Sequence, residues 1–183
     1  MNKYYLVEGE TEKAFIAYLK AARFIDSGKI RVFNLMQETI SDAHEFLSVR
    51  NTEFICIIDT DVITENTLAC LAQNLRKLKQ SASTKHVKLL MQNKNFEDEL
   101  CRLLQCTKKE LPQTVHSKGE NLKSTKQKLA GMTPEDYGKL LKETAARIPV
   151  TYCAVPPKNF LKALNDRNLS ALIADSKQIL RKP

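Results

Sequence analysis

Short apolar runs alternate with helix-like segments through the first 106 residues of the chain. Four runs rich in β-branched and aromatic residues predict strands at 4–7, 30–33, 54–58 and 87–91. The third run is apolar throughout, which is typical of a strand that is buried on both faces. Because helices separate these strands, right-handed crossovers are favoured. We therefore expect an α/β fold with a four-stranded parallel sheet flanked by helices.

Apolar residues at helical spacing predict the segments between and after the strands. Thr11 is expected to cap the first helix, whose apolar positions run from Ala14 to Ala22. Further helices are expected at 41–49, 64–79 and 96–104. After residue 106 the alternation ends, and the pattern predicts an edge strand at 151–155 and helices at 121–130, 134–147, 157–166 and 169–180. The sequence therefore predicts an α/β domain over residues 1–106 and a mainly helical extension over residues 107–183.

The excess of basic charge lies entirely in the predicted extension. Residues 1–106 hold 14 basic and 14 acidic side chains, whereas residues 107–183 hold 15 and 7, which accounts for the net charge of +8. Lysines that contact phosphates release condensed counterions, so this asymmetry favours a nucleic-acid partner. A solvated, lysine-rich helical surface is the alternative. The densest group of lysines is Lys108, Lys109, Lys118, Lys123, Lys126 and Lys128.

Composition also bears on the class of protein. No stretch approaches the roughly 18 apolar residues that a membrane helix needs, and the first apolar run is too short for a signal peptide. We therefore expect a cytoplasmic protein that has no membrane partner. Five cysteines without zinc-finger spacing are expected to be reduced thiols that bind no zinc. They are Cys56, Cys70, Cys101, Cys106 and Cys153.

Acidic residues follow three of the four predicted strands. Glu8 ends the first strand and Glu12 lies one helical turn later, Asp59 and Asp61 follow the third strand, and Glu97 comes after the fourth. The carboxyl ends of parallel strands meet at one edge of the sheet, so these side chains should converge there. Carboxylates in one cleft repel each other and either raise their pKa values or bind a divalent cation. The pattern therefore predicts a site for Mg²⁺ or Mn²⁺, and two such ions could cleave a phosphodiester.

Simpler roles exist for some of these acids. Glu12 by itself could interact with the dipole at the start of the first helix. Asp98 and Glu99 are expected to be solvated charges at the start of a later helix.

The chain carries L-V-E-G-E-T-E at 6–12 and Asp59-Thr60-Asp61 after the third predicted strand. Together these two motifs resemble the Toprim domain, which occurs in topoisomerases, bacterial primases, a ribosomal RNA maturase and the OLD-type defence nucleases. The form V-E-G-x-T-E is most similar to the OLD and RloB-like branch. That branch has a further acid one turn into the first helix, matched by Glu12, and another after the fourth strand, matched by Glu97. The resemblance covers residues 3–106.

The resemblance implies a Mg²⁺- or Mn²⁺-dependent nuclease that cleaves phosphodiester bonds in DNA or RNA. Glu8, Asp59 and Asp61 would be catalytic metal ligands, and Glu12 and Glu97 would complete a second metal position. Gly9 would let the chain turn sharply beside the metals without a Cβ clash. OLD-type nucleases also use a lysine from beyond the acids to stabilise transition-state charge, and Lys118 is the candidate here.

The chain also departs from the relatives that the resemblance names. It contains no G-x-x-x-x-G-K-[ST] motif of an ATPase domain and no zinc module of a primase. A compact Toprim protein in phage defence is therefore expected, with a homodimer or a partner defence protein as further options. A ribonuclease that processes structured RNA and an inactive module that binds nucleic acid or protein stay open. The lysines expected to contact nucleic acid are Lys108, Lys109, Lys123, Lys126 and Lys128.

Overall fold

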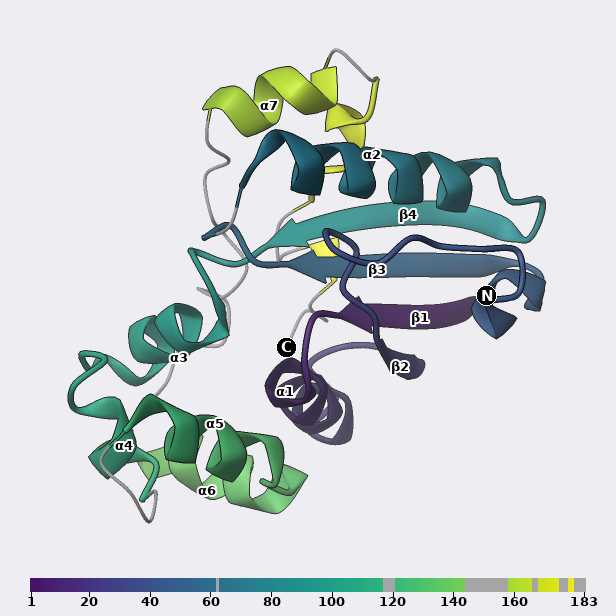
Figure 1. Ribbon diagram of the computed structural model, residues 1–183. Helices are drawn as coiled ribbons and strands as arrows, with labels where there is room; N and C mark the ends of the chain where they lie inside the picture. The colour runs from purple at the N-terminus through teal and green to yellow at the C-terminus, as the bar shows by residue number, and fades with distance from the viewer. Residues whose placement is uncertain (62, 117–120, 144–157, 166–167, 175–177, 180–183) are drawn as a thin grey trace.

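The computed structural model describes residues 1–61, 63–116, 121–143, 158–165, 168–174 and 178–179. A four-stranded parallel sheet with the strand order β2-β1-β3-β4 forms its centre (Figure 1). The strands are β1 (Asn2–Val7), β2 (Lys29–Val32), β3 (Thr52–Ile58) and β4 (Thr84–Met91). This arrangement confirms the predicted α/β fold.

Helices cover both faces of the sheet (Figure 1). On one side lie α1 (Glu10–Ala21), α3 (Phe96–Leu104), α5 (Leu122–Ala130) and α6 (Pro134–Glu143). On the other side lie α2 (Glu65–Gln80) and α7 (Lys158–Asn165). Three short turns of helix complete the described structure, and these are η1 (Glu45–Ser48), α4 (Leu111–Thr114) and η3 (Ser170–Leu172).

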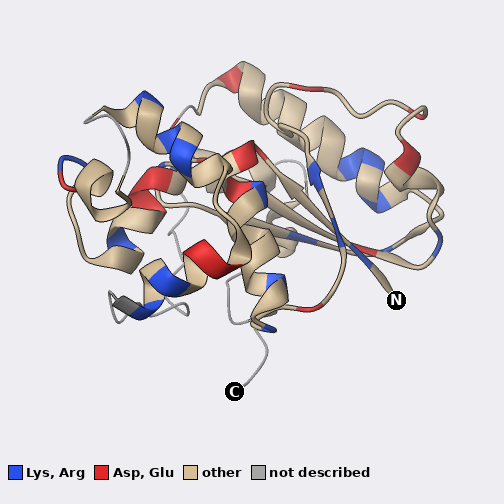
Figure 2. Cartoon of the chain, turned by 90° about the horizontal axis from the view of Figure 1, so that it is seen from below, with Lys and Arg blue, Asp and Glu red and all other residues tan. Residues whose placement is uncertain are grey.

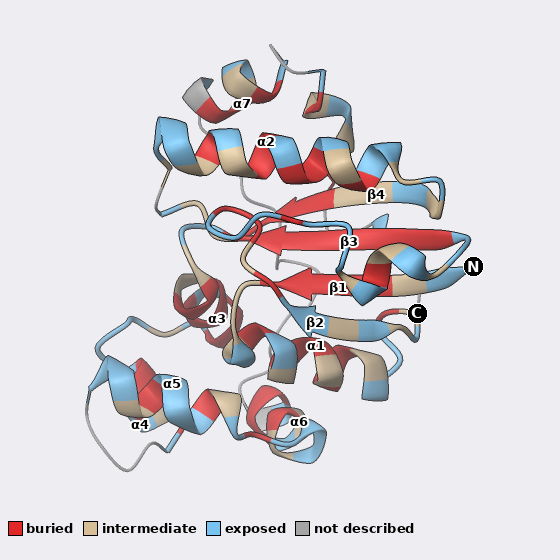
Figure 3. Ribbon diagram, turned by 45° about the vertical axis from the view of Figure 1, so that its right-hand side comes forward, coloured by how far each residue is buried: buried red, intermediate tan, exposed pale blue. Residues whose placement is uncertain are grey.

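Strand β3 is buried along its whole length because it lies between two other strands and between the two helical layers (Figure 3). Alternate side chains of a strand point to opposite faces. Ile55 and Ile57 accordingly pack in the hydrophobic cluster beneath α1, whereas Cys56 and Ile58 pack in the cluster beneath α2. Burial on both faces explains why the sequence of this strand is apolar throughout.

The described residues after position 106 share both hydrophobic clusters with the α/β domain. Leu129 of α5 and Tyr137 of α6 are buried in the same cluster as Phe15 of α1. The rings of Phe15 and Tyr137 meet edge-on, with their centroids 5.6 Å apart. Phe160 of α7 is buried on the other face, in the cluster that contains the apolar side of α2. Helices α5 and α6 therefore pack directly on α1, close to the carboxyl edge of the sheet.

The start of the first helix differs from the prediction. Gly9 is the residue before α1, and Thr11 lies inside the first turn, where its hydroxyl donates to Glu12. Apolar spacing locates a helix only to within a turn, so it does not distinguish the two positions. The helix predicted at 41–49 is also wrong in extent, because only Glu45–Ser48 forms a single 3₁₀ turn.

The chain after Leu169 differs more strongly from the predicted helix at 169–180. It forms the short η3 turn, and Ile173 then makes a parallel bridge to Leu89 of β4. The backbone N–H of Ala174 donates to the Leu89 carbonyl at 2.8 Å. An edge strand offers unpaired backbone groups, and this segment uses some of those of β4.

Several other expectations fall at or beyond the limits of the described structure. The strand predicted at 151–155 and Cys153 lie outside the described residues. Helix α4 is one turn long, too short for the apolar spacing to predict, and Pro112 fits its first turn because no backbone N–H is needed there. Four cysteines in the described part of the chain are free thiols, namely Cys56, Cys70, Cys101 and Cys106. No helix within the described ranges is both long enough and apolar enough to cross a membrane.

Candidate functional site

Glu8 and Asp59 meet at the carboxyl edge of the sheet. Their strands β1 and β3 pair in parallel with Leu6 beside Cys56, so the residues that follow the two strands are neighbours. One carboxylate oxygen of Glu8, Oε2, accepts a hydrogen bond from the backbone N–H of Asp59 at 3.2 Å. The other oxygen, Oε1, accepts from Nδ2 of Asn34 at 2.8 Å. The sheet topology thus brings together two acids that are 51 residues apart in the chain.

Asp61 is fixed by the loop that follows β4. Its Oδ2 accepts a hydrogen bond from Nδ2 of Asn95 at 2.9 Å. The backbone N–H groups of Thr60 and Asp61 both donate to the carbonyl of Lys94. Asn95 is also the residue that caps α3, whose first turn carries Glu97. One asparagine therefore links the loop after β3 to the helix that bears the later acid.

A cleft of about 380 Å³ lies between the first turn of α1, the end of β3 and α5. Glu12 and Glu97 are nearly inaccessible there, at 4% and 2% exposure, whereas Asp61 is exposed. Four of the five acids proposed from the sequence therefore line one cleft, and Asp61 lies outside its lining. The lining residues are Glu8, Gly9, Glu10, Thr11, Glu12, Asp59, Glu97, Lys126, Gln127 and Ala130.

Burial and mutual repulsion perturb these carboxyl groups. Burial, followed by the charges of Glu8, Glu12, Asp61 and Glu97, raises the pKa of Asp59 to about 9. Burial also raises the pKa of Glu12, and the charges of Glu97 and Glu8 add to the effect. The pKa of Glu8 is raised by burial and by Asp61, although hydrogen bonds to its carboxylate partly oppose this. The cleft therefore favours protonation of these carboxyls unless a positive charge stabilises their ionised forms.

Most of the acids already have a polar partner, and Asp59 is the exception. Oε2 of Glu12 accepts from the Thr11 hydroxyl at 3.0 Å, and Oε1 of Glu97 pairs with Nζ of Lys126 at 3.3 Å. By contrast, Oδ1 of Asp59 is buried and has no hydrogen-bond partner in the described part of the chain. A buried carboxylate oxygen without a donor is rare and fits a position that a cation would satisfy.

The carboxylates do not form a ready-made coordination shell. Among the residues that the structure describes, no three His, Cys, Asp and Glu side chains are placed so that they could hold a metal ion. Glu8, Asp61 and Glu97 are each held by a contact with another side chain. The donors are all oxygen atoms, as Mg²⁺ and Mn²⁺ prefer. The residues therefore fit such an ion chemically, but they must exchange partners to bind it.

The described lysines divide into those near acidic side chains and those on open surface. Lys126 lines the acid cleft, and Lys108 pairs with Asp98 at 2.8 Å. Lys118, proposed as the catalytic lysine, lies outside the described residues. Figure 2 shows that Lys and Arg positions are spread over several helices rather than collected on one. The remaining lysines predicted to contact nucleic acid are exposed, and they are Lys109, Lys123 and Lys128.

Two amide side chains contact acids of the site although the search for acids missed them, and a third lies beside Asp59 at the same sheet edge. Asn34 and Asn95 hold Glu8 and Asp61, and each follows a strand. Gln92 follows β4 as Asp59 follows β3, and the two are neighbours in register because Ile58 pairs with Met91. The Gln92 side chain is fully buried, and neither of its amide atoms has a hydrogen-bond partner among the described residues. A search for any polar residue after a strand would have found all three.

Glu99 does not match its expected role as a solvated charge. It is 1% exposed, and its Oε1 accepts a hydrogen bond from the backbone N–H of Asn93 at 2.6 Å. Arg102, one turn later in α3, pairs with the same carboxylate at 3.2 Å. The buried face of an amphipathic helix can include a charge when such partners are present, and the sequence pattern alone does not show them.

Gly9 provides space rather than an unusual backbone conformation. Its φ of −145° is extended and open to any residue, so no sharp turn requires glycine here. A Cβ atom at this position, however, would lie only 3.0 Å from Oε2 of Glu12. The absence of a side chain therefore lets the Glu12 carboxylate approach the backbone at the start of α1.

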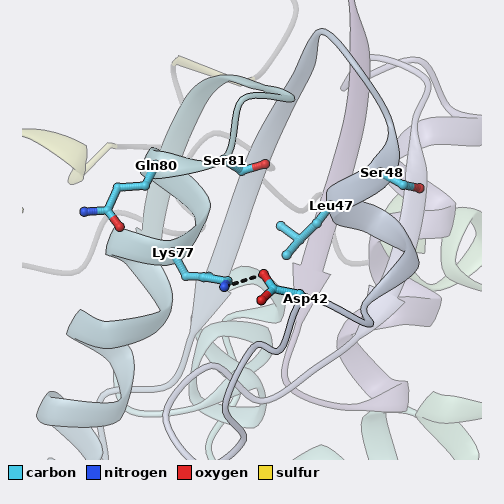
Figure 4. Close-up of a pocket in the computed structure, with 6 residues that line it drawn as sticks. All are labelled: Asp42, Leu47, Ser48, Lys77, Gln80 and Ser81. Carbon is cyan, nitrogen blue, oxygen red and sulfur yellow. Dashed lines mark ion pairs between the residues drawn. The ribbon is translucent and has the colours of Figure 1, made fainter.

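A second cleft, also of about 380 Å³, lies beside the C-terminal end of α2. Lys77 and Asp42 point toward each other across it and form an ion pair (Figure 4). Because its one acidic and one basic lining residue are paired with each other, this cleft has no gathered charge comparable to that of the acid cleft. The lining residues are Asp42, Leu47, Ser48, Lys77, Gln80 and Ser81.

Comparisons of this chain with protein-family models, with curated proteins and with solved structures find no match. The Toprim resemblance therefore stands on the motifs of the chain alone. Function has to be argued from the residues of the site rather than from a relative.

Proposed function

We propose that the chain is a Mg²⁺- or Mn²⁺-dependent nuclease of the Toprim type that cleaves phosphodiester bonds in DNA or RNA. The observation that supports this most is the half-buried Asp59, whose backbone N–H donates to Glu8. Its Oδ1 is buried in a cleft with Glu12 and Glu97 and has no hydrogen-bond partner among the described residues. Clustered, buried acids destabilise a fold, so such an arrangement is typical of a site that binds a cation.

Different residues of the site would bind the ions, orient the ligands and bind the substrate. Glu8 and Asp59 would hold one ion, and Glu12 and Glu97 would contribute to a second position. Bound there, divalent ions supply an activated water and stabilise the charge on the leaving oxygen. Asn34 orients the Glu8 carboxylate, and Asn95 orients Asp61, which lies outside the lining of the cleft. Exposed lysines of the extension would bind phosphates and keep the polyanion near the acids, which would otherwise repel it.

A cleavage screen tests the proposal. Plasmid DNA, single-stranded DNA and structured RNA would each be incubated with the protein in Mg²⁺, in Mn²⁺ and in EDTA. We expect cleavage of at least one substrate with metal, and its loss in the double variant Glu8→Gln, Asp59→Asn. Asp42→Asn, in the second cleft, is the control that removes a carboxylate without touching the site. Full activity of the double variant would contradict the proposed roles of these acids.

An inactive Toprim module that binds nucleic acid or protein is the second candidate. It is favoured by the lack of a preassembled group of three metal-binding side chains in the described residues and by the pairing of Glu97 with Lys126. Binding of nucleic acid without cleavage in either metal would select this candidate. Cleavage confined to structured RNA would instead indicate a processing ribonuclease. A role in phage defence, and a homodimer or a partner defence protein, are further parts of the proposal that rest on the resemblance. A cytoplasmic location is also proposed, and it rests on the composition of the chain and its cysteine spacing.

A further inference from the structure

Lys126 holds a position in the acid cleft that its sequence context does not suggest. It lies on α5, a helix of the basic extension, and its side chain is 53% exposed. Its Nζ nevertheless lies 3.3 Å from Oε1 of Glu97, a side chain that is only 2% exposed. The ammonium group therefore reaches from the surface toward a carboxylate that is otherwise shielded from water.

The packing of α5 explains this reach. Helix α5 contacts α1, and Leu129 anchors it in the cluster that contains Phe15. This places Lys126 and Gln127 over the cleft that begins at the first turn of α1. The charge of Lys126 also favours the ionised form of Glu8, so its field extends across the cleft beyond Glu97.

We propose that Lys126 is a built-in counter-cation of the acid cleft, whose ammonium group competes with a divalent cation for Glu97. Occupation of the carboxylates by the divalent ion would release Lys126 from Glu97 toward the phosphate of a bound nucleic acid. The inference rests on the proposed function, because it concerns the same cleft and the same ion. It changes the role expected for Lys126 from a phosphate contact to a residue that links metal binding to substrate binding.

Because of this competition, binding of the divalent ion and the contact between Lys126 and Glu97 weaken each other. A divalent ion weakens the contact between Lys126 and Glu97, and that contact in turn weakens binding of the ion by the same factor. Within the described part of the chain, Oδ1 of Asp59 is buried in the cleft without a hydrogen-bond partner, and so is the amide of Gln92 beside it at the same sheet edge, so both offer oxygen atoms that the ion could use. The ion would therefore replace the ammonium of Lys126 at Glu97 and would gain contacts with several oxygen atoms.

Titration of the full chain with Mn²⁺ alone, followed by calorimetry, tests the competition without any measurement of cleavage. The variant Lys126→Met should bind Mn²⁺ about fivefold or more tightly than the unaltered protein. Lys123→Met is the matched control, because it removes the same charge from the same helix at an exposed position. We expect less than a twofold change for this control, since solvent screens the exposed charge. Lys126→Arg, which keeps a cation able to pair with Glu97, should stay close to the unaltered protein.

A double-variant cycle separates the contact from the general effect of charge. If Lys126 acts through Glu97, then Lys126→Met should give little further gain in Mn²⁺ affinity once Glu97→Gln is present. Thermal unfolding of each variant establishes that it is folded. Equal gains for Lys126→Met and Lys123→Met, or no gain for Lys126→Met, would overturn the inference and leave the proposed function standing. Failure of the unaltered protein to bind Mn²⁺ at all would overturn both.

Discussion

Replacement of Asp59 by asparagine should stabilise the metal-free protein. The Asp59 carboxyl is partly buried, faces four other acids, and has one oxygen without a hydrogen-bond partner in the described structure. Asparagine has nearly the same shape but no charge and no proton to lose. The substitution therefore removes a group that must take up a proton when the chain folds at neutral pH, while it preserves packing. If Asp59 instead stabilised the fold through an ion pair, the same substitution would lower the stability of the protein.

The magnitude follows from the shift in the pKa of Asp59, from 3.8 to about 9. The folded protein binds this proton more tightly than the unfolded chain does, so stability falls as pH rises between about 4 and 9. A pH of 7 lies about 3 pH units above the pKa of the unfolded chain, so the free energy of unfolding that Asp59 removes at this pH is at most about 4 kcal/mol. Solvent near the half-buried group reduces this, and we expect a gain of about 2 kcal/mol for Asp59→Asn. For a chain of this size such a gain raises the Tm by about 4–8 °C.

Thermal unfolding in EDTA, followed by circular dichroism from pH 5 to pH 9, measures this gain. The difference in Tm between Asp59→Asn and the unaltered protein should grow with pH across that range. Asp61→Asn is the matched control, since Asp61 is exposed and already accepts a hydrogen bond from Asn95. We expect this control to change the Tm little at any pH. A lower Tm for Asp59→Asn in EDTA, or a difference that does not vary with pH, would refute the reasoning.

Three further perturbations test other parts of the structure. Burial disfavours ionised Glu53, but hydrogen bonds from Lys3 and Lys88 outweigh this and hold its pKa below the usual value. The ionised Glu53 therefore stabilises the fold above about pH 4.5, and this stabilisation is lost as pH falls through the folded pKa. Glu53→Gln should lower the free energy of unfolding by about 3 kcal/mol at pH 7 and by less in acid, and urea titrations at neutral and at acidic pH would measure both losses. Gly9→Ala should shift the Glu12 carboxylate and weaken Mn²⁺ binding in calorimetry, with little change in Tm, because the added Cβ meets Oε2 of Glu12. A triple variant replaces the exposed residues Lys109, Lys123 and Lys128 by glutamine. If these lysines contact phosphates, the slope of log affinity for DNA against log salt concentration should flatten by about two to three units. An unchanged slope would mean that they form an ordinary solvated surface.

The sequence by itself determined the sheet and the location of the acids. The five-residue apolar run 54–58 is short and rich in β-branched residues, which favours a strand that is covered on both faces. Once the strands are parallel, their carboxyl ends share an edge, so Glu8 and Asp59 must become neighbours. Helix α3 was equally predictable, because Asn95 caps it and its apolar spacing is regular.

Only the tertiary structure decided which partners these acids have. Nothing near Lys126 in the sequence distinguishes it from five other lysines of the same basic stretch, and its contact with Glu97 depends on how α5 packs against α1. Local patterns likewise do not show the contact between Asn34 and Glu8, nor that the Gln92 amide is without a partner among the residues that the structure describes. Hydrophobic spacing specifies which face of an element is buried, because burial depends on one side chain at a time. A polar contact depends on the relative position of two elements that are distant in the chain, and only packing sets that position.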